Sequence, residues 1–262
     1  MGRMREKLRS VSMLVAAADT PVPLIFDSLR LQRNIYTARL RSGLSFLLQP
    51  GYGEWYTLLE CAVRMDYFQN GIEVHDGDTV IDVGANFGAF TIAASRKVGE
   101  SGRVFSYEPN PFVFERLQQN IRLNGCRNVT AFNEAVGGQD GNIDLFIGSK
   151  SAFSTTQPEV DGRLSSRSHS TRVPLRAMES AIGMAGPSVA LLKIDCEGGE
   201  YDILDRLTPA AAASVSQVSM EVHHIPGRSV DSIPQLLAAL GFDVVATSPL
   251  TAFRRTRTRP TA

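Results

Sequence analysis

The sequence predicts an α/β fold: a doubly wound, mostly parallel seven-stranded sheet with helices on both faces. The first reason is an alternation, from about residue 78 onward, of short β-branched runs with amphipathic segments of helical period. Such alternation is typical of βαβ units. The second reason is a glycine-rich turn, Gly84 to Gly88, directly after the first predicted strand. Open α/β sheets bind their ligands beside turns of this kind.

Each element of the predicted sheet is a short apolar run bounded by polar or turn residues. The expected strands are Thr79–Val83, Val104–Tyr107, Val129–Asn133, Val189–Ile194, Val215–Val222, Phe242–Ala246 and a last one near Thr251–Arg254. The helices expected between them are Ala89–Val98, Phe112–Asn124, Glu200–Leu207 and Ile233–Leu240. Gly241 follows the last helix, where glycine commonly ends one.

Two further regions frame this core. Residues 1–75 carry helical apolar spacing interrupted by prolines and by the Gln49–Gly53 breaker, and predict an N-terminal helical extension or lid. Residues 76–262 form the main domain. Within it, residues 148–172 contain seven serines and read as a long loop between two hairpin strands, Asn142–Ile147 and Arg172–Arg176. A loop of that length is either a substrate-side flap or disordered.

Composition limits the partners. The 262 residues carry 27 basic and 27 acidic groups, but the basic ones gather at the ends. Without ten residues at each end, 19 basic and 26 acidic groups remain, which argues against nucleic acid as a partner. No stretch approaches the roughly 20 apolar residues that span a bilayer, so no membrane partner is expected. Three scattered cysteines predict reduced thiols and a cytoplasmic location.

The glycine turn discriminates between two ligand classes. A dinucleotide prefers Gly-x-Gly-x-x-Gly, but Asn86 and Ala89 stand at the second and third glycine positions. Asp82, on the strand itself, is a poor neighbour for phosphate and suits the cationic amino-acid end of S-adenosylmethionine. Glu108, which closes the second strand, is placed to bind ribose hydroxyls and occurs in both classes. The residues favour S-adenosylmethionine and leave a nicotinamide-dependent oxidoreductase and a turn without ligand as alternatives.

Three segments together resemble the FkbM-type methyltransferases: Asp82–Gly88, Tyr107–Pro111 and Leu192–Glu200. The similarity covers roughly residues 78–225, and the Lys-x-Asp-x-Glu-Gly-x-Glu signature within it is quite specific. The departures are modest, with Cys196 and Gly199 where valine and alanine are commoner. The resemblance implies a Rossmann-like class I methyltransferase fold, S-adenosylmethionine as cofactor, and usually O-methylation.

The resemblance also implies a cofactor site. The methionine end is expected on Asp82, Gly84, Asn86 and Gly88, the ribose on Glu108, and the adenine beside Asn133 to Ala135. Glu54 stands where related proteins often have an acid that closes over the cofactor; the alternative is a surface carboxylate on a loop. Ser154 matches a serine that is often present in the family and is expected to touch substrate.

On the acceptor side, a hydroxyl is a weak nucleophile that needs a base or a metal. Asp195 and Glu197 share a face if their strand persists that far, although Glu197 could instead stabilise the start of the next helix. Glu221 and His223 share a face at the end of the fifth strand, where His223 could act as base or ligand. His224 takes the other face, towards substrate. The expected catalytic residues are Asp195, His223, Glu221 and Glu197.

Asp195, Glu221 and His223 could together bind a divalent cation, but the sequence assigns no metal. The expected activity is an S-adenosylmethionine-dependent O-methylation of a small-molecule hydroxyl, on a natural product or a sugar. Methylation of nitrogen or of a carboxylate, and a non-catalytic cofactor-binding subunit, are the alternatives. The acceptor itself cannot be read from the chain.

Overall fold

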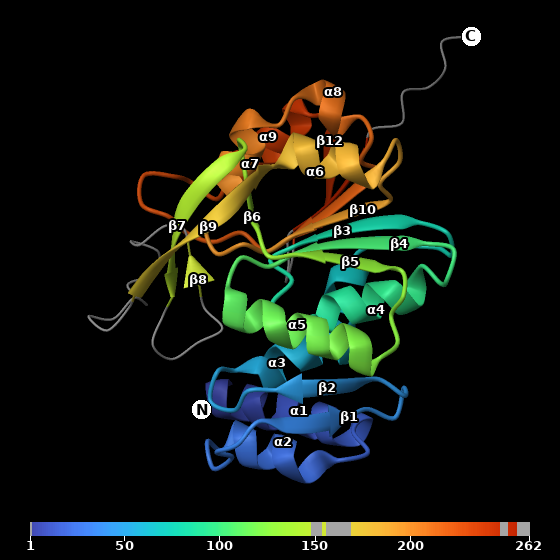
Figure 1. Cartoon of the computed structure of the whole chain (residues 1–262), viewed down its shortest axis with the longest axis vertical. Coiled ribbons are helices and arrows are strands. Elements are labelled where there is room, and N and C mark those ends of the chain that lie inside the picture. Colours follow the sequence, from blue (N-terminus) through green and yellow to red (C-terminus); the bar gives the residue numbers. More distant parts are fainter. Residues whose placement is uncertain (1, 148–153, 156–168, 247–250, 256–262) are drawn as a thin grey trace.

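The computed structural model describes residues 2–147, 154–155, 169–246 and 251–255. Its centre is a seven-stranded sheet of order β12-β13-β11-β10-β3-β4-β5 (Figure 1). The strands are β3 (Thr79–Val83), β4 (Arg103–Tyr107), β5 (Val129–Phe132), β10 (Leu191–Ile194), β11 (Gln217–Met220), β12 (Phe242–Ala246) and β13 (Thr251–Arg255). Neighbouring strands pair in parallel except at β13, which is antiparallel to both β11 and β12. The predicted doubly wound fold is confirmed.

Helices cover both faces of this sheet (Figure 1). One face carries α4 (Ala89–Lys97) and α5 (Pro111–Leu123), and the other carries α6 (Met178–Ala185), α7 (Glu200–Arg206), α8 (Pro209–Ala212) and α9 (Ser232–Ala239). Strand residues alternate between the two faces: Val80 packs in the hydrophobic core towards α4, and Ile81 in the core towards α6 and α7. Burial on both faces explains why the strands read as near-continuous apolar runs.

The chain first builds β3, β4 and β5 outwards in one direction, and later returns to place β10 on the other side of β3. The carboxyl ends of β3 and β10 therefore flank the point where the strand order reverses. Ligands of open α/β sheets bind at such a point, so the sheet order alone directs attention to the residues that follow these two strands.

The N-terminal layer is only partly helical. It contains α1 (Gly2–Ala17), α2 (Pro21–Ser28), α3 (Glu54–Leu58) and two short helical turns, η1 (Leu59–Arg64) and η2 (Asp66–Phe68). Between α2 and α3, β1 (Tyr36–Arg39) and β2 (Ser45–Leu48) form an antiparallel pair, so the helical expectation is wrong there. The reason is a period of two: Tyr36, Ala38, Phe46 and Leu48 are buried, and their neighbours are less so.

This layer shares its core with the main domain. Leu14, Leu24 and Phe46 belong to the same hydrophobic cluster as Val80 and Phe90. Asparagine side chains on α5 add polar contacts: Asn120 Oδ1 accepts from Leu47 N at 2.6 Å, and Asn124 Oδ1 accepts from Ser45 N at 2.9 Å. The asparagine amides donate back to the carbonyls of Leu47 and Ser45.

A second, four-stranded sheet stands beside the main one and has the order β6-β9-β7-β8 (Figure 1). Its strands are β6 (Ala135–Gly137), β7 (Gly141–Ile147), β8 (Ser154–Thr155) and β9 (His169–Ala177). The antiparallel pair of β7 and β9 confirms the predicted hairpin strands. Of the predicted flap, residues 148–153 and 156–168 lie outside the described residues. Among the helices that the structure describes, none has the length and apolarity to cross a bilayer.

Candidate functional site

A cavity opens at the carboxyl edge of the main sheet, where the strand order reverses. Its walls are the turn after β3, the end of β4, the start of β6, Leu145 on β7 and the loop between β10 and α7. Of the residues predicted to bind the cofactor, Gly84, Asn86, Glu108 and Ala135 line it. Of the predicted catalytic residues, Asp195 and Glu197 line it as well. These predicted residues therefore lie together around one cavity at the predicted edge of the sheet.

The two glycines of the β3–α4 turn are required by the protein's own packing. Gly84 has φ +76°, and a Cβ there would lie 1.7 Å from the backbone oxygen of Asp195. Gly88 has φ +96°, and a Cβ there would lie 2.6 Å from Leu117 Cδ1. Close approach of a ligand to these glycines remains a prediction. The packing of the turn on the loop after β10 and on α5 is a second reason for glycine at both positions.

Glu108 closes one wall of the cavity at the end of β4. Its Oε2 accepts from the backbone N–H of Asn86 at 2.8 Å and its Oε1 from that of Asn110 at 2.9 Å. Burial raises the pKa of this carboxyl to about 7, against the opposing effect of the two N–H donors. Asn133 does not line the cavity; its side chain donates to the carbonyls of Glu108 and Pro109 and holds this strand end in place. Glu134, which lies within the predicted segment Asn133 to Ala135, lines the cavity beside Ala135.

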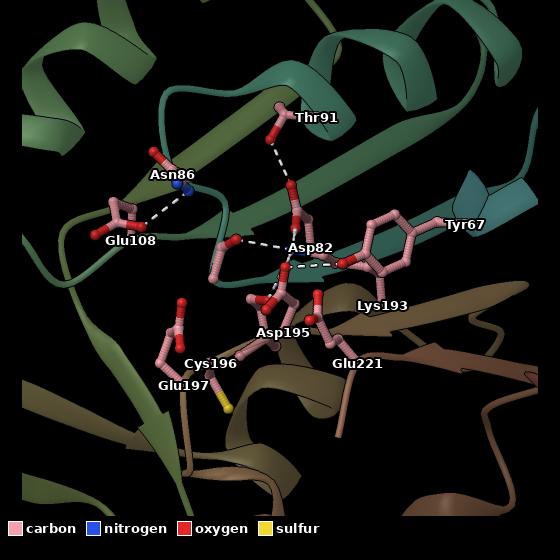
Figure 2. A network of polar contacts seen from close by, with 12 residues as sticks. Tyr67, Asp82, Asn86, Thr91, Glu108, Lys193, Asp195, Cys196, Glu197 and Glu221 are labelled. Carbon is pink, nitrogen blue, oxygen red and sulfur yellow. Dashed lines mark hydrogen bonds and ion pairs between the residues drawn. The ribbon is translucent and has the colours of Figure 1, made fainter. Parts of the chain in front are cut away.

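Asp82 and Lys193 form a buried pair beneath the turn (Figure 2). Asp82 points to the same face of the sheet as Val80, has no exposed surface, and does not line the cavity. Its Oδ2 accepts from Thr91 at 2.6 Å, and its Oδ1 lies 3.1 Å from Lys193 Nζ. The predicted direct contact of Asp82 with a cofactor is therefore corrected, because the carboxylate faces a lysine.

Lys193 connects this pair to the turn and to the acceptor side. Its ammonium donates to the carbonyl of Gly84 at 2.7 Å and lies 3.8 Å from Asp195 Oδ2. Burial lowers the pKa of Lys193, but Asp82 and Asp195 outweigh burial and raise it, so the side chain is a cation. This lysine is part of the family signature, but no role was predicted for it.

Asp195 and Glu197 meet at the site by a different route from the one predicted. Strand β10 ends at Ile194, and Glu197 has φ +55°, so the two carboxylates do not share a strand face. The loop nevertheless brings both towards His223. Asp195 Oδ1 lies 4.0 Å from His223 Nε2, and Glu197 Oε2 lies 3.3 Å from it. Asp195 Oδ2 accepts from the hydroxyl of Tyr67 at 2.8 Å (Figure 2).

His223 is the centre of the acceptor-side group. Strand β11 ends at Met220, and the chain then turns so that His223 is buried while His224 is exposed. His223 Nδ1 lies 2.8 Å from Oε1 of Glu200, which is fully buried at the start of α7. Glu221 Oε1 lies 3.8 Å from His223 Nε2. Burial lowers the pKa of His223, but Glu200, Glu197 and Asp195 together raise it to about 9.

Two residues of this group escaped the sequence reasoning. Glu200 stands in the family signature, where no separate role was predicted for it, and it also accepts from the backbone N–H of Gly198. Tyr67 lies in η2, in a region without a motif, and nothing in its local sequence indicates that it reaches Asp195. Its ring packs edge-on against Phe90 of α4.

Glu54 and Ser154 have positions that the sequence did not predict. Glu54 is buried at the start of α3, where its carboxylate accepts from Arg116 at 2.7 Å and from the backbone N–H of Gln49 at 2.6 Å. It is not a surface carboxylate, and it does not line the cavity; it ties the N-terminal layer to α5. The backbone of Ser154 pairs with that of Ile147, and its contact with substrate remains a prediction.

The comparisons with known proteins agree with this geometry. Residues 82–244 match the model of the methyltransferase FkbM domain. The chain is 27% identical over 249 residues to 31-O-demethyl-FK506 methyltransferase FkbM of Streptomyces tacrolimicus, covering 85% of this chain and 91% of that protein. It is 27% identical over 190 residues to Methyltransferase 1 of Beauveria bassiana, covering 66% and 76%. It is 28% identical over 152 residues to hexuronic acid methyltransferase AglP of Haloferax volcanii, covering 58% of each chain.

The family match extends from Asp82 on β3 to Val244 on β12, and so includes every wall of the cavity and the acceptor-side group except Tyr67. With the sheet order and the cavity described above, it rules out the nicotinamide-dependent alternative. This chain belongs to the FkbM methyltransferase family and is an S-adenosylmethionine-dependent methyltransferase.

Proposed function

We propose that the protein transfers the methyl group of S-adenosylmethionine to a hydroxyl oxygen of a small molecule, either a natural product or a sugar. The observation that carries this proposal is the group of Asp195, Glu197, Glu221 and His223 at the edge of the cavity. An oxygen acceptor must lose a proton during transfer, and proton acceptors are concentrated at this position.

The cavity fits the cofactor by the chemistry of its walls. Glu108 offers a carboxylate for the ribose hydroxyls, and Gly84 and Asn86 present the backbone of the β3–α4 turn. Ala135, with Glu134 and Val136, supplies the wall beside the adenine. The bound cofactor supplies an electrophilic methyl group. The protein has to hold the acceptor oxygen in line with that methyl, a positioning effect worth several kcal/mol, on the order of 7 or more in favourable cases.

The buried Asp82–Lys193 pair positions the two halves of the site. Lys193 donates to the carbonyls of Val83 and Gly84 on the cofactor side and faces Asp195 on the acceptor side. A single ammonium group thus sets the position of the turn and of the first acceptor-side carboxylate. We assign this pair a positioning role and place the chemistry on the residues that border the cavity.

Two relatives support a small-molecule acceptor, since one acts on 31-O-demethyl-FK506 and one on a hexuronic acid. The first of these also supports an oxygen acceptor. The three cysteines of this chain are free thiols, which supports the cytoplasm as the compartment of the reaction.

The test has two parts. Calorimetric titration of S-adenosylhomocysteine should give one site per chain. S-adenosylmethionine with an isotopically labelled methyl group should then label a hydroxylated acceptor, from a panel of macrolide alcohols and hexuronic acids, in a product that resists mild alkali. An alkali-labile product would indicate a methyl ester. A labelled amine would indicate transfer to nitrogen, and either result would contradict methylation of a hydroxyl group.

A further inference from the structure

We propose that Asp195, Glu221 and His223, with Glu197 beside them, form a binding site for a divalent metal ion at the rim of the cavity. The inference deepens the proposed function, since the ion would lie where the acceptor oxygen has to be held. Its test does not depend on that function, because the ion can be bound and measured with neither cofactor nor acceptor present.

The donor atoms already converge. One ligand atom from each of Asp195, Glu221 and His223 lies within 4.8 Å of the others. Around His223 Nε2, carboxylate oxygens lie at 3.3 Å (Glu197), 3.8 Å (Glu221) and 4.0 Å (Asp195). These separations fit ligands that surround a common centre, and the distances to Glu221 and Asp195 are too long for direct charge-assisted hydrogen bonds.

His223 and Asp195 are each held in orientation by a hydrogen bond on the side that faces away from the proposed ion. His223 is buried, with 8% of its side chain exposed, and its Nδ1 is bound to Glu200, which leaves Nε2 directed at the carboxylates. The two carboxylate oxygens of Asp195 have different partners: Oδ2 accepts a hydrogen bond from Tyr67, and Oδ1 faces His223. A carboxylate behind the far nitrogen of an imidazole is the usual support of a metal-binding histidine. A cluster of surface carboxylates without a metal-binding role would not need a hydrogen bond that orients the imidazole.

The local charge favours a cation. Three carboxylates surround one imidazole, and the ammonium of Lys193, at 3.8 Å from Asp195, is shared with Asp82. Arg64 is paired with Glu60 and Asp66.

The site is open on one side. The side chains of Asp195, Glu197 and Glu221 are 27%, 28% and 51% exposed, and the first two also line the cavity. An ion held there would keep coordination positions for water or for an acceptor oxygen. Metal coordination lowers the pKa of a bound hydroxyl and favours its deprotonation. Two or three carboxylate oxygens with one imidazole nitrogen suit Mn²⁺ better than the all-oxygen preference of Ca²⁺ or Mg²⁺.

The experiment is a titration of the full-length, metal-free protein with MnCl₂ alone, followed by the loss of the electron paramagnetic resonance signal of free Mn²⁺. We expect one bound ion per chain. Glu221→Gln, at an exposed position that leaves the fold intact, should weaken binding about tenfold or more, and His223→Gln should abolish it. Glu200→Gln, which removes the carboxylate behind the imidazole and keeps an amide oxygen that can accept from the Gly198 N–H, should weaken it by about 10- to 100-fold.

Asp205→Asn is the matched control. It removes one carboxylate at the far end of α7, where Asp205 pairs with Arg228. Its Mn²⁺ affinity should equal that of the unaltered protein. The proposal is overturned if millimolar Mn²⁺ leaves the free signal intact, or if Glu221→Gln and His223→Gln bind the ion as tightly as Asp205→Asn.

The outcomes also separate this inference from the proposed function. Bound Mn²⁺ without any binding of S-adenosylhomocysteine would leave the metal site standing and remove the enzymatic assignment. Binding of S-adenosylhomocysteine without Mn²⁺ would do the reverse. His223 and its carboxylates would then be a purely ionic network beside the acceptor.

Discussion

The two sides of the cavity are built by different physical means. On the cofactor side, the β3–α4 turn is fixed by backbone contacts, with Gly84 against the Asp195 carbonyl and Asn86 donating to Glu108. On the acceptor side, partly exposed charged side chains meet around His223. The first side depends on steric fit, which a single methyl group can destroy. The second depends on charge, which can be altered without moving the chain. Substitutions should therefore damage folding on one side and catalysis on the other.

The largest effect is expected from Gly84→Ala. The added Cβ would overlap the Asp195 carbonyl, and the residue would keep an unfavourable positive φ. We expect a loss of about 3 kcal/mol or more in the free energy of unfolding, measured by urea denaturation. Gly43→Ala is the control, because Gly43 has a similar φ of +86° but nothing within 4 Å of its Cβ. It should cost only about 1–2 kcal/mol. Equal losses at both positions would show that packing on the Asp195 loop is unimportant.

Asp195→Asn should show the opposite behaviour. The amide oxygen can still accept from Tyr67, so the urea midpoint should stay close to that of the unaltered protein. The charge that faces His223 and the acceptor is lost, so the rate of methyl transfer should fall by about 100-fold or more. The rate is measured by label transfer from S-adenosylmethionine, and the affinity for S-adenosylhomocysteine serves as the control. An unchanged rate would place the chemistry elsewhere.

The pH dependence of cofactor binding tests Glu108. Burial raises its pKa to about 7, so the carboxyl is mostly protonated at pH 6 and ionised at pH 8. Hydroxyl donors bind the ionised form better. The Kd of S-adenosylhomocysteine should therefore fall about tenfold from pH 6 to pH 8, and Glu108→Gln should remove that dependence. If the Kd of Glu108→Gln still changes with pH, the titrating group is a residue other than Glu108.

The same shift in pKa has a consequence for stability. The folded protein binds the Glu108 proton more tightly than the unfolded chain, whose carboxyl has the ordinary value of 4.5. The contribution of this group to the free energy of unfolding is therefore fully present below pH 4.5 and declines as the pH rises towards 7. Glu108→Gln should flatten that part of the stability profile.

Tyr67→Phe should have the smallest effect. It removes one hydrogen bond to Asp195 and keeps the ring against Phe90. We expect a loss of about 0.5–1.5 kcal/mol in the free energy of unfolding and a several-fold lower rate of methyl transfer. Tyr52→Phe, at an exposed tyrosine, provides the comparison. If both variants have the unaltered rate, Tyr67 does not help to position Asp195.

The same contrast explains what could be predicted from the sequence. Strand periodicity and the strand-end rule located the sheet, the turn, Glu108 and Asp195, because those features are local. The roles predicted for single residues were less accurate. Asp82 pairs with Lys193, and glycine is required at position 84 by contact with a loop more than 100 residues away in the sequence. Glu200 and Tyr67 reach the site only through tertiary packing. The hairpin of residues 36–48 was missed because its strands have only four residues each. An alternation of buried and exposed positions over so few residues is a weaker signal than the helical spacing on either side of it.

The asparagine contacts on α5 have a structural consequence for β2. Asn120 and Asn124 are four residues apart on a helix, a rise of about 6 Å, and Ser45 and Leu47 are two apart on a strand, about 6.6 Å. The two spacings nearly coincide, so each amide can satisfy both backbone groups of its partner residue. Helix α5 thereby makes the hydrogen bonds to β2 that a further neighbouring strand would otherwise make. The outer edge of β2 is protected at Ser45 and Leu47 against pairing with another chain, and α5 packs on it in a single register.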